Sequence, residues 1–345
     1  MSKNKHKFLT FAALMTGATV AVHFINHTIA TAAQLKQMLH SSNDNYFEWR
    51  FGNIYYTKKG TGSPILLIHD TLPGASGYEW SKIEDELAID HTVYTVDLLG
   101  CGRSDKSSIT EDITLYRICT AVEPDAIDKM IGIHSSPSPF CPVGRKIQSV
   151  LDDTYEELKT DVIASGFSGS FVTMACHNEK ELFNKIMLVN PPSLTQLKQM
   201  PNRKDRLLKA ALEIPIFGTL VYHMIVSRDN INNLFIEKMY CNPFHVDNQM
   251  ADAYYEAAHK GGYYTRFLYS SLAAKYININ ICHALKALDN SIYIVEGETE
   301  PNGKAVTDDY CASNPAIEVS VLKETKHLPH VEAPEAFLEQ VKIFF

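Results

Sequence analysis

Two consecutive segments decide the fold: the strand-like run Thr160-Asp161-Val162-Ile163-Ala164 and the small-residue turn Gly166-Phe167-Ser168-Gly169-Ser170. The residues from about Gly169 to Cys176 then predict a helix. A serine on a sharp strand-to-helix turn has its hydroxyl projecting above the sheet edge, and small residues two positions either side let neighbouring backbone pass close. Ser168 is therefore the candidate nucleophile. A plain Gly/Ser turn between strand and helix is the alternative interpretation.

Seven other segments have strand character. They are Phe47–Phe51, Ile54–Thr57, Ile65–Ile68, Thr92–Val96, Lys185–Val189, Ser291–Val295 and Ile317–Leu322. Helical patterns such as Tyr78–Ala88 separate several of them, and Pro334–Phe345 is predicted to be a closing helix. Alternating strands and helices predict a doubly wound, mostly parallel eight-stranded α/β sheet.

One stretch, from Pro191 to about Asn290, has helical pattern and no convincing strand. We interpret it as an all-helical cap inserted between two sheet strands. The expected organisation is an N-terminal anchor and connector over 1–46, a core over 47–190 and 291–345, and a cap over 191–290.

Two loops that follow the last strands contain the candidate general base and its carboxylate partner. A general base must reach the serine above the sheet, and the loop after the final strand delivers His327, with His330 as its rival. A carboxylate after Ser291–Val295 orients the imidazole, and we choose Glu300. The alternatives to Glu300 are a solvated acidic turn or one of the aspartates Asp289, Asp308 and Asp309.

The oxyanion of an acyl-transfer reaction needs backbone N–H donors. The run Leu67-Ile68-His69-Asp70-Thr71 ends a buried strand. The N–H groups of Thr71 and Gly169 are therefore the candidate donors.

The order of these segments resembles the α/β-hydrolase family, in the branch with esterases, haloperoxidase-like and dehalogenase-like members. Asp97–Asp105 is similar to that family's D-x-x-G-x-G-x-S segment, and His327–Glu335 to its C-terminal signature. The resemblance covers roughly residues 47–345 and implies that Ser168 is the nucleophile and His327 the catalytic histidine. The chain departs from the family at His69-Asp70, where His-Gly is usual. Serine at position 168 argues against dehalogenase or epoxide hydrolase chemistry, which in this family uses a carboxylate.

The expected function is hydrolysis of a small ester-like, apolar acyl substrate by two-step acyl transfer, as in a carboxylic ester hydrolase. A non-catalytic binding module on the same fold is one alternative, since fold does not settle function. A cofactor-free peroxidase or C–C bond hydrolase is another. We expect no cofactor and no metal, because no motif indicates a metal, nucleotide or flavin. The seven cysteines form no CxxC pair and have no zinc-like spacing.

Composition narrows the partners. The 345 residues are 45% hydrophobic and 21% charged, with a net charge of −8. The sequence contains no cluster of basic residues that would indicate nucleic-acid binding. Lys3, Lys5 and Lys7 precede an apolar run over 8–25, which favours a membrane anchor with the N-terminus inside and the catalytic domain extracytoplasmic. A cleaved signal peptide with the site Ala30-Thr31-Ala32 competes with this interpretation, and a cytoplasmic location stays open.

Overall fold

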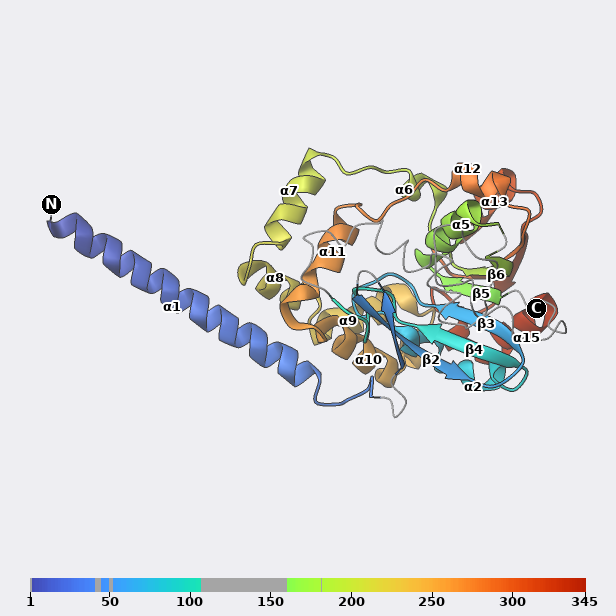
Figure 1. The fold of residues 1–345 in the computed structure, drawn as a ribbon, viewed down its shortest axis with the longest axis horizontal. Helices are drawn as coiled ribbons and strands as arrows, with labels where there is room; N and C mark the ends of the chain where they lie inside the picture. Colours follow the sequence, from blue (N-terminus) through green and yellow to red (C-terminus); the bar gives the residue numbers. More distant parts are fainter. Residues whose placement is uncertain (1, 41–44, 50–51, 107–159, 181) are drawn as a thin grey trace, which may run out of the picture.

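The computed structural model describes residues 2–40, 45–49, 52–106, 160–180 and 182–345 (Figure 1). Its strands are β1 (Asn45–Trp49), β2 (Gly52–Lys59), β3 (Ser63–Ile68), β4 (His91–Val96), β5 (Thr160–Ser165), β6 (Phe183–Val189), β7 (Ser291–Gly297) and β8 (Glu318–Leu322). The helices of the sheet domain are η1 (Gly77–Trp80), α2 (Glu84–Leu87), α5 (Ser168–Asn178), α13 (Gly303–Ser313), α14 (Pro329–Glu332) and α15 (Pro334–Phe344), and α1 (Ser2–Ala33) precedes them.

All eight predicted strands form, and they lie in one sheet of order β1-β2-β4-β3-β5-β6-β7-β8. The β1–β2 and β2–β4 pairs are antiparallel, and every pairing from β4 to β8 is parallel. The prediction of a mostly parallel eight-stranded sheet is confirmed. Strands β3 and β5 are neighbours although β4 lies between them in sequence, so the loops after β3 and β5 meet where the winding direction changes. In open α/β sheets, ligands bind at this place.

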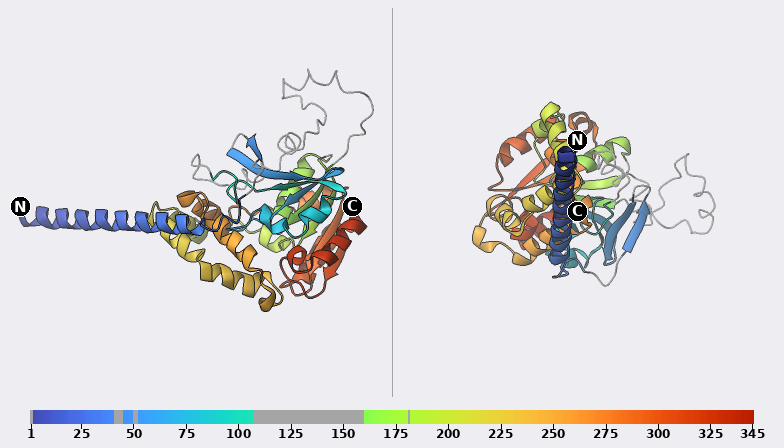
Figure 2. Two further views of the ribbon diagram at one scale, coloured as in Figure 1. Left: turned by 90° about the horizontal axis from the view of Figure 1, so that it is seen from below. Right: turned by 90° about the vertical axis from the view of Figure 1, so that its left-hand side faces the viewer.

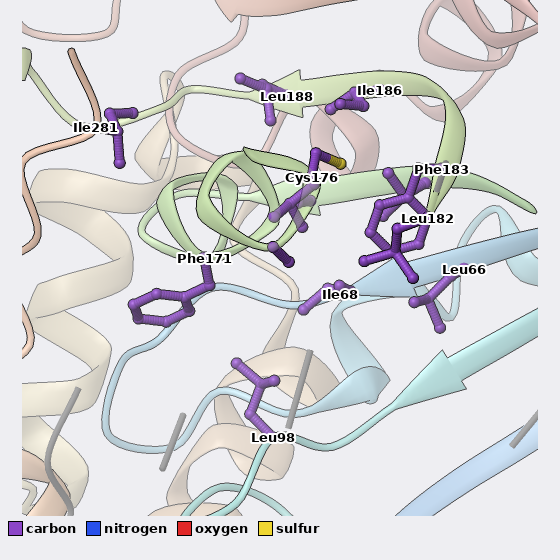
Figure 3. Packing of buried hydrophobic residues seen from close by; sticks show 14 of the residues in the cluster. Leu66, Ile68, Leu98, Phe171, Cys176, Leu182, Phe183, Ile186, Leu188 and Ile281 are labelled. Atoms are coloured by element: carbon purple, nitrogen blue, oxygen red, sulfur yellow. The ribbon is translucent and has the colours of Figure 1, made fainter. Parts of the chain in front are cut away.

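The sheet has a hydrophobic core on each face. In β5, Val162 and Ala164 belong to one core while Ile163 belongs to the other, because successive side chains of a strand point to opposite faces. The first core packs against Phe171 of α5 (Figure 3). The second packs against Trp80 and against α15. Burial on both faces explains why the central strands are continuous apolar runs.

The expected helix over Tyr78–Ala88 is divided into η1 and α2. Glu84, the first residue of α2, accepts hydrogen bonds from Thr57 at 2.8 Å and Thr95 at 3.0 Å, and it pairs with Lys59. These contacts fix the start of α2 against β2 and β4. The break still allows Trp80 and Leu87 to be buried together.

The residues between β6 and β7 form the helices α6 (Leu194–Leu197), α7 (Arg203–Leu212), α8 (Phe217–Ile225), α9 (Arg228–Leu234), η3 (Phe235–Met239), η4 (Pro243–His245), α10 (Asn248–His259), η5 (Gly262–Tyr264), α11 (Arg266–Ala273) and α12 (Cys282–Ala287). Several of these helices share a core that includes Phe235, Met250 and Tyr254. The same core contains Leu328, from the loop after β8, so this helical segment packs directly on the loop that carries His327.

Helix α1 extends away from the rest of the molecule (Figures 1 and 2). Its last turns are packed, with Asn26 donating to the carbonyl of Ile216 at 2.9 Å and Ala30 and Ala33 buried. The first residues of the connector that the sequence predicts are therefore the last turns of α1. Among the described residues no single helix is both long and apolar enough to cross a membrane, whereas α7 and α8 meet these limits only as a pair bent by 101°.

Candidate active site

His327 and Glu300 come together at the ends of the last two strands. The Nδ1 atom of His327, from the loop after β8, lies 3.2 Å from Oε1 of Glu300, which is in the turn after β7. Asp289 instead pairs with Lys180 at the surface. The structure thus brings together the imidazole and the carboxylate that the sequence indicates.

Asn190, directly after β6, holds this pair in place. Its side-chain amide donates to the carbonyls of Lys326 at 2.8 Å and His327 at 2.9 Å, and its Oδ1 accepts from the N–H of Gly297 at 3.0 Å. A side chain at Gly297 would overlap the carbonyl of Lys326, so this glycine permits the close approach of β7 to the histidine loop. One asparagine therefore joins the ends of β6, β7 and β8.

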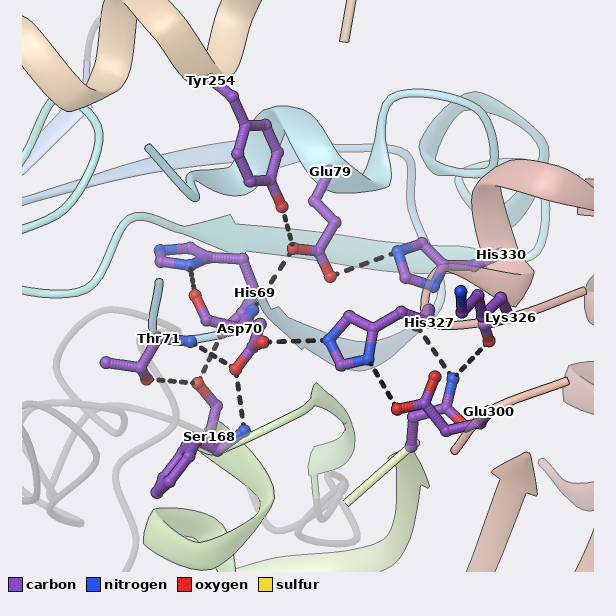
Figure 4. A network of polar contacts seen from close by, with 12 residues as sticks. His69, Asp70, Thr71, Glu79, Ser168, Tyr254, Glu300, Lys326, His327 and His330 are labelled. Carbon is purple, nitrogen blue, oxygen red and sulfur yellow. Dashed lines mark hydrogen bonds and ion pairs between the residues drawn. The ribbon is translucent and has the colours of Figure 1, made fainter. Parts of the chain in front are cut away.

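The other side of the imidazole faces Asp70 (Figure 4). Nε2 of His327 lies 3.2 Å from Oδ2 of Asp70. Oδ1 of Asp70 accepts from the backbone N–H of Thr71 at 2.7 Å and of Phe167 at 2.8 Å. The Asp70 side chain is only 4% exposed. Its carboxylate joins the loop after β3, the turn after β5 and the histidine loop.

The two carboxylates determine the charge of His327. Burial opposes the charged imidazolium, but the hydrogen bonds that it donates to Asp70 and Glu300 more than offset this effect and raise the pKa of His327 to about 10. Near neutral pH the resting site is a carboxylate–imidazolium–carboxylate array. A protonated imidazole is an acid, and it becomes a general base only after losing its proton.

Ser168 does not contact His327. Its hydroxyl donates to the carbonyl of His69 at 2.5 Å and lies 3.1 Å from Oγ1 of Thr71, and it is fully buried. Among the described residues Ser168 forms no hydrogen bond with His327, and Figure 4 shows the Asp70 carboxylate between them. The expectation that this hydroxyl faces the imidazole is therefore corrected: Ser168 ties the first turn of α5 to the loop after β3.

The correction has a local cause, since the sharp turn lies two residues earlier than expected. Gly166 has φ +53° and α5 begins at Ser168 itself. The N–H of Gly169 donates to the carbonyl of Gly166 at 3.2 Å, within the turn, so Gly169 is not an oxyanion donor here. The backbone N–H groups that converge on Oδ1 of Asp70 are those of Thr71 and Phe167.

The sequence contains a pattern that indicates the earlier position of the sharp turn. The run Ala164-Ser165-Gly166-Phe167-Ser168 has the same spacing of small residues as the run centred on Ser168, but its centre is a glycine. A search for a serine at the centre passes over it. The unusual aspartate at position 70 is the second half of the signal, because its carboxylate occupies the space beside Gly166.

The rival histidine, His330, belongs to a separate buried pair. Its Nε2 lies 3.2 Å from Oε1 of Glu79, and its ring stacks on Trp80 with centroids 4.3 Å apart. Oε2 of Glu79 accepts from the Tyr254 hydroxyl at 3.1 Å and the Asp70 N–H at 3.3 Å. Burial raises the pKa of Glu79, but His330 and then His69 overcome this and lower it to about 2. This pair supports the backbone that carries Asp70.

Other binding features lie elsewhere. A cavity of about 250 Å³ lies between the end of α1 and α10, and its lining contains neither Asp70 nor His327. Within the described ranges no group of three or more His, Cys, Asp or Glu residues has the arrangement of a metal site.

Comparisons with known proteins agree with this fold. The profile of the Alpha/beta hydrolase family matches residues 65–340. The solved meta-cleavage product hydrolase from Pseudomonas fluorescens IP01 superimposes with a TM-score of 0.63 at 17% identity, covering 85% of this chain and 94% of that one.

Two curated proteins match over shorter stretches. The pimeloyl-[acyl-carrier protein] methyl ester esterase of Aliivibrio salmonicida (strain LFI1238) is 29% identical over 134 residues, 32% of this chain and 51% of the esterase. The putative HTH-type transcriptional regulator YwnA of Bacillus subtilis (strain 168) is 40% identical over 48 residues, 14% of this chain and 35% of the regulator. The chain thus spans about half or less of the length of these relatives.

Proposed function

Because the chain belongs to the α/β-hydrolase family, we propose that it is a hydrolase of a small-molecule substrate in which His327, oriented by Glu300, transfers the protons of the reaction. The observation that carries this proposal is the 3.2 Å contact between His327 Nδ1 and Glu300. A carboxylate on one ring nitrogen fixes the orientation of the ring and leaves the other nitrogen for the reacting groups. The His327 side chain is 18% exposed, so it is not sealed inside the core.

The finer form of the proposal is cleavage of an ester-like substrate through an acyl-enzyme on Ser168. The methyl ester esterase among the relatives favours ester chemistry. The contacts of Ser168 do not favour this nucleophile, because its hydroxyl must first leave the carbonyl of His69 and pass the Asp70 carboxylate. A fluorophosphonate probe tests it directly: covalent labelling at Ser168 supports the acyl-enzyme, and an unlabelled folded protein rejects it.

The test of the hydrolase proposal is a substrate panel with matched histidine variants. Purified full-length protein is incubated with p-nitrophenyl esters of increasing acyl length, with epoxides and with bromoalkanes, and product is measured. His327→Gln should lower the rate of any substrate that turns over by about 10²–10⁴-fold, the usual contribution of general acid–base catalysis. His245→Gln is the control, because His245 is exposed on η4.

Turnover that is equally fast in His327→Gln would overturn the proposal. So would the absence of turnover across the whole panel. That second result favours a non-catalytic binding module on this fold.

We also propose that α1 associates with a lipid surface. Leu14, Val20 and Phe24 are 68%, 63% and 70% exposed, and lysines precede them in sequence. Apolar side chains with adjacent basic residues are attracted to anionic bilayers. Flotation with vesicles of phosphatidylcholine and phosphatidylglycerol tests this. Phe24→Asp should reduce binding and Ile343→Asp, at the other end of the chain, should not; equal binding of all three proteins rejects the proposal.

A further inference from the structure

Gly166 stands where a strand-to-helix turn would present a nucleophile. Its φ of +53° is the strained conformation of such a turn, and its N–H donates to the carbonyl of Val189 at 2.9 Å, which fixes the turn to β6. With no side chain, Gly166 has no group that can react.

The Asp70 carboxylate fills the space that a side chain at position 166 would take. A Cβ atom added at Gly166 would overlap all three carboxyl atoms of Asp70. The residue after the turn, Phe167, and Thr71 in the loop after β3 both donate backbone N–H groups to Oδ1. These are the two donors that form an oxyanion hole in a strand–turn–helix site. Oδ2 faces the imidazole of His327.

One oxygen of Asp70 is therefore held where an oxyanion is stabilised, and the other lies where a nucleophile meets the general base. A carboxylate that only stabilised the fold would not need one oxygen on the two backbone N–H groups and the other against the imidazole. The Asp70 side chain comes from the loop after β3, whereas the turn after β5 contributes only backbone groups to this arrangement.

We propose that Asp70 is the nucleophile of this enzyme and that its substrates are epoxides. The inference rests on the proposed function, because it uses His327 and Glu300 in the same roles. A carboxylate that attacks an ester carbonyl must expel an alkoxide, a much poorer leaving group than itself. Displacement at a strained saturated carbon instead gives a stable ester.

The proton that His327 carries in the resting site can be donated to the oxygen of an opening epoxide ring. Oδ2 of Asp70 forms a bond to an epoxide carbon, the carbon–oxygen bond of the ring breaks, and the ring oxygen takes the proton from Nε2 of His327. The products of this step are a hydroxyalkyl ester on Asp70 and a neutral imidazole. Esterification removes one of the two charges that hold the proton on His327, so the imidazole can now act as a base.

The second step returns the enzyme to its starting state. Neutral His327 takes a proton from water as the water oxygen bonds to Cγ of Asp70, and the N–H groups of Thr71 and Phe167 stabilise the oxyanion at Oδ1. The bond from Cγ to the ester oxygen breaks, and the diol leaves with the proton from His327. The carboxylic acid then passes its own proton to His327. The sum is epoxide plus water giving diol, with no proton left over.

The test follows one oxygen atom and one covalent bond. Full-length protein and styrene oxide are mixed in H₂¹⁸O with enzyme in excess, and the peptide containing Asp70 is analysed by mass spectrometry. Because water attacks Cγ, ¹⁸O should enter the Asp70 carboxylate. In the natural chain quenched at short times the hydroxyalkyl ester should be found on Asp70. His327→Gln lacks both the proton donor of the first step and the base of the second, so neither the ester nor ¹⁸O should appear on its Asp70. Asp70→Asn should show neither signal, whereas Asp289→Asn, at an 89% exposed carboxylate, should match the natural chain.

The outcomes separate the two proposals. An ester on Asp70 without turnover supports the nucleophile and overturns the hydrolase proposal. Turnover that depends on His327, with no ¹⁸O and no adduct on Asp70, overturns the nucleophile and leaves the hydrolase proposal standing. Neither turnover nor adduct with styrene oxide overturns the nucleophile, and the hydrolase proposal falls with it only if the whole substrate panel also shows no turnover. If Asp70→Asn does not fold, the ¹⁸O label and the transient ester on Asp70 of the natural chain still decide.

Discussion

Replacing Gly166 by alanine tests whether the Asp70 carboxylate occupies the side-chain space of the turn. The substitution has two costs. An L-residue in the left-handed conformation costs about 1–2 kcal/mol. The new Cβ would also overlap the Asp70 carboxyl group, which must move away from the N–H groups of Thr71 and Phe167. Hydrogen bonds to a charged group are worth about 1.5–3 kcal/mol each.

Gly262→Ala is the matched control, because Gly262 has φ +63° and nothing within 4 Å of an added Cβ. We expect Gly166→Ala to lower the free energy of unfolding by about 3 kcal/mol or more beyond Gly262→Ala, since two such hydrogen bonds are lost. In an Asp70→Ala background the overlap is gone, and the two glycine substitutions should then cost nearly the same. The difference between backgrounds is the coupling energy of the pair.

Urea unfolding followed by circular dichroism at constant pH measures all the variants. Equal costs for the two glycine substitutions in the natural background would refute the reasoning. So would a Gly166→Ala cost that is unchanged when Asp70 is removed, because the strain would then come from the turn alone.

Three further predictions concern the same array. The double variant Gly166→Ser with Asp70→Gly should gain p-nitrophenyl ester hydrolysis and fluorophosphonate labelling at position 166, and a lack of labelling in folded protein would count against the nucleophile position. The folded-state pKa of His327, about 10, lies above its ordinary value of 6.5, so its contribution to stability is complete below pH 6.5 and is lost as the pH rises through 10. The urea midpoint should fall over this range, and His327→Gln should flatten the profile. Glu79→Gln should cost about 3–5 kcal/mol in urea unfolding, because it breaks a fully buried pair with His330; a cost below 1 kcal/mol would mean that the pair is not formed.

The sequence by itself determined the sheet and one half of the candidate site. The strands are short apolar or β-branched runs whose character survives any tertiary context, so all eight could be located. His327 and Glu300 each follow a late strand directly, and the carboxyl ends of parallel strands meet at one edge, so their proximity follows from topology alone.

Only the tertiary structure decided which residue occupies the sharp turn and which group faces His327. Two overlapping runs, centred on Gly166 and Ser168, fit the small-residue spacing equally well. The pairing of β5 with β6 and the hydrogen bond from Gly166 to Val189 fix the turn at the glycine. Asp70 is 257 residues from His327, and its carboxylate enters the site only because β3 and β5 are neighbours. A two-residue shift at one turn and a contact between distant loops depend on packing, and local sequence pattern alone neither chooses between the two runs nor locates that contact.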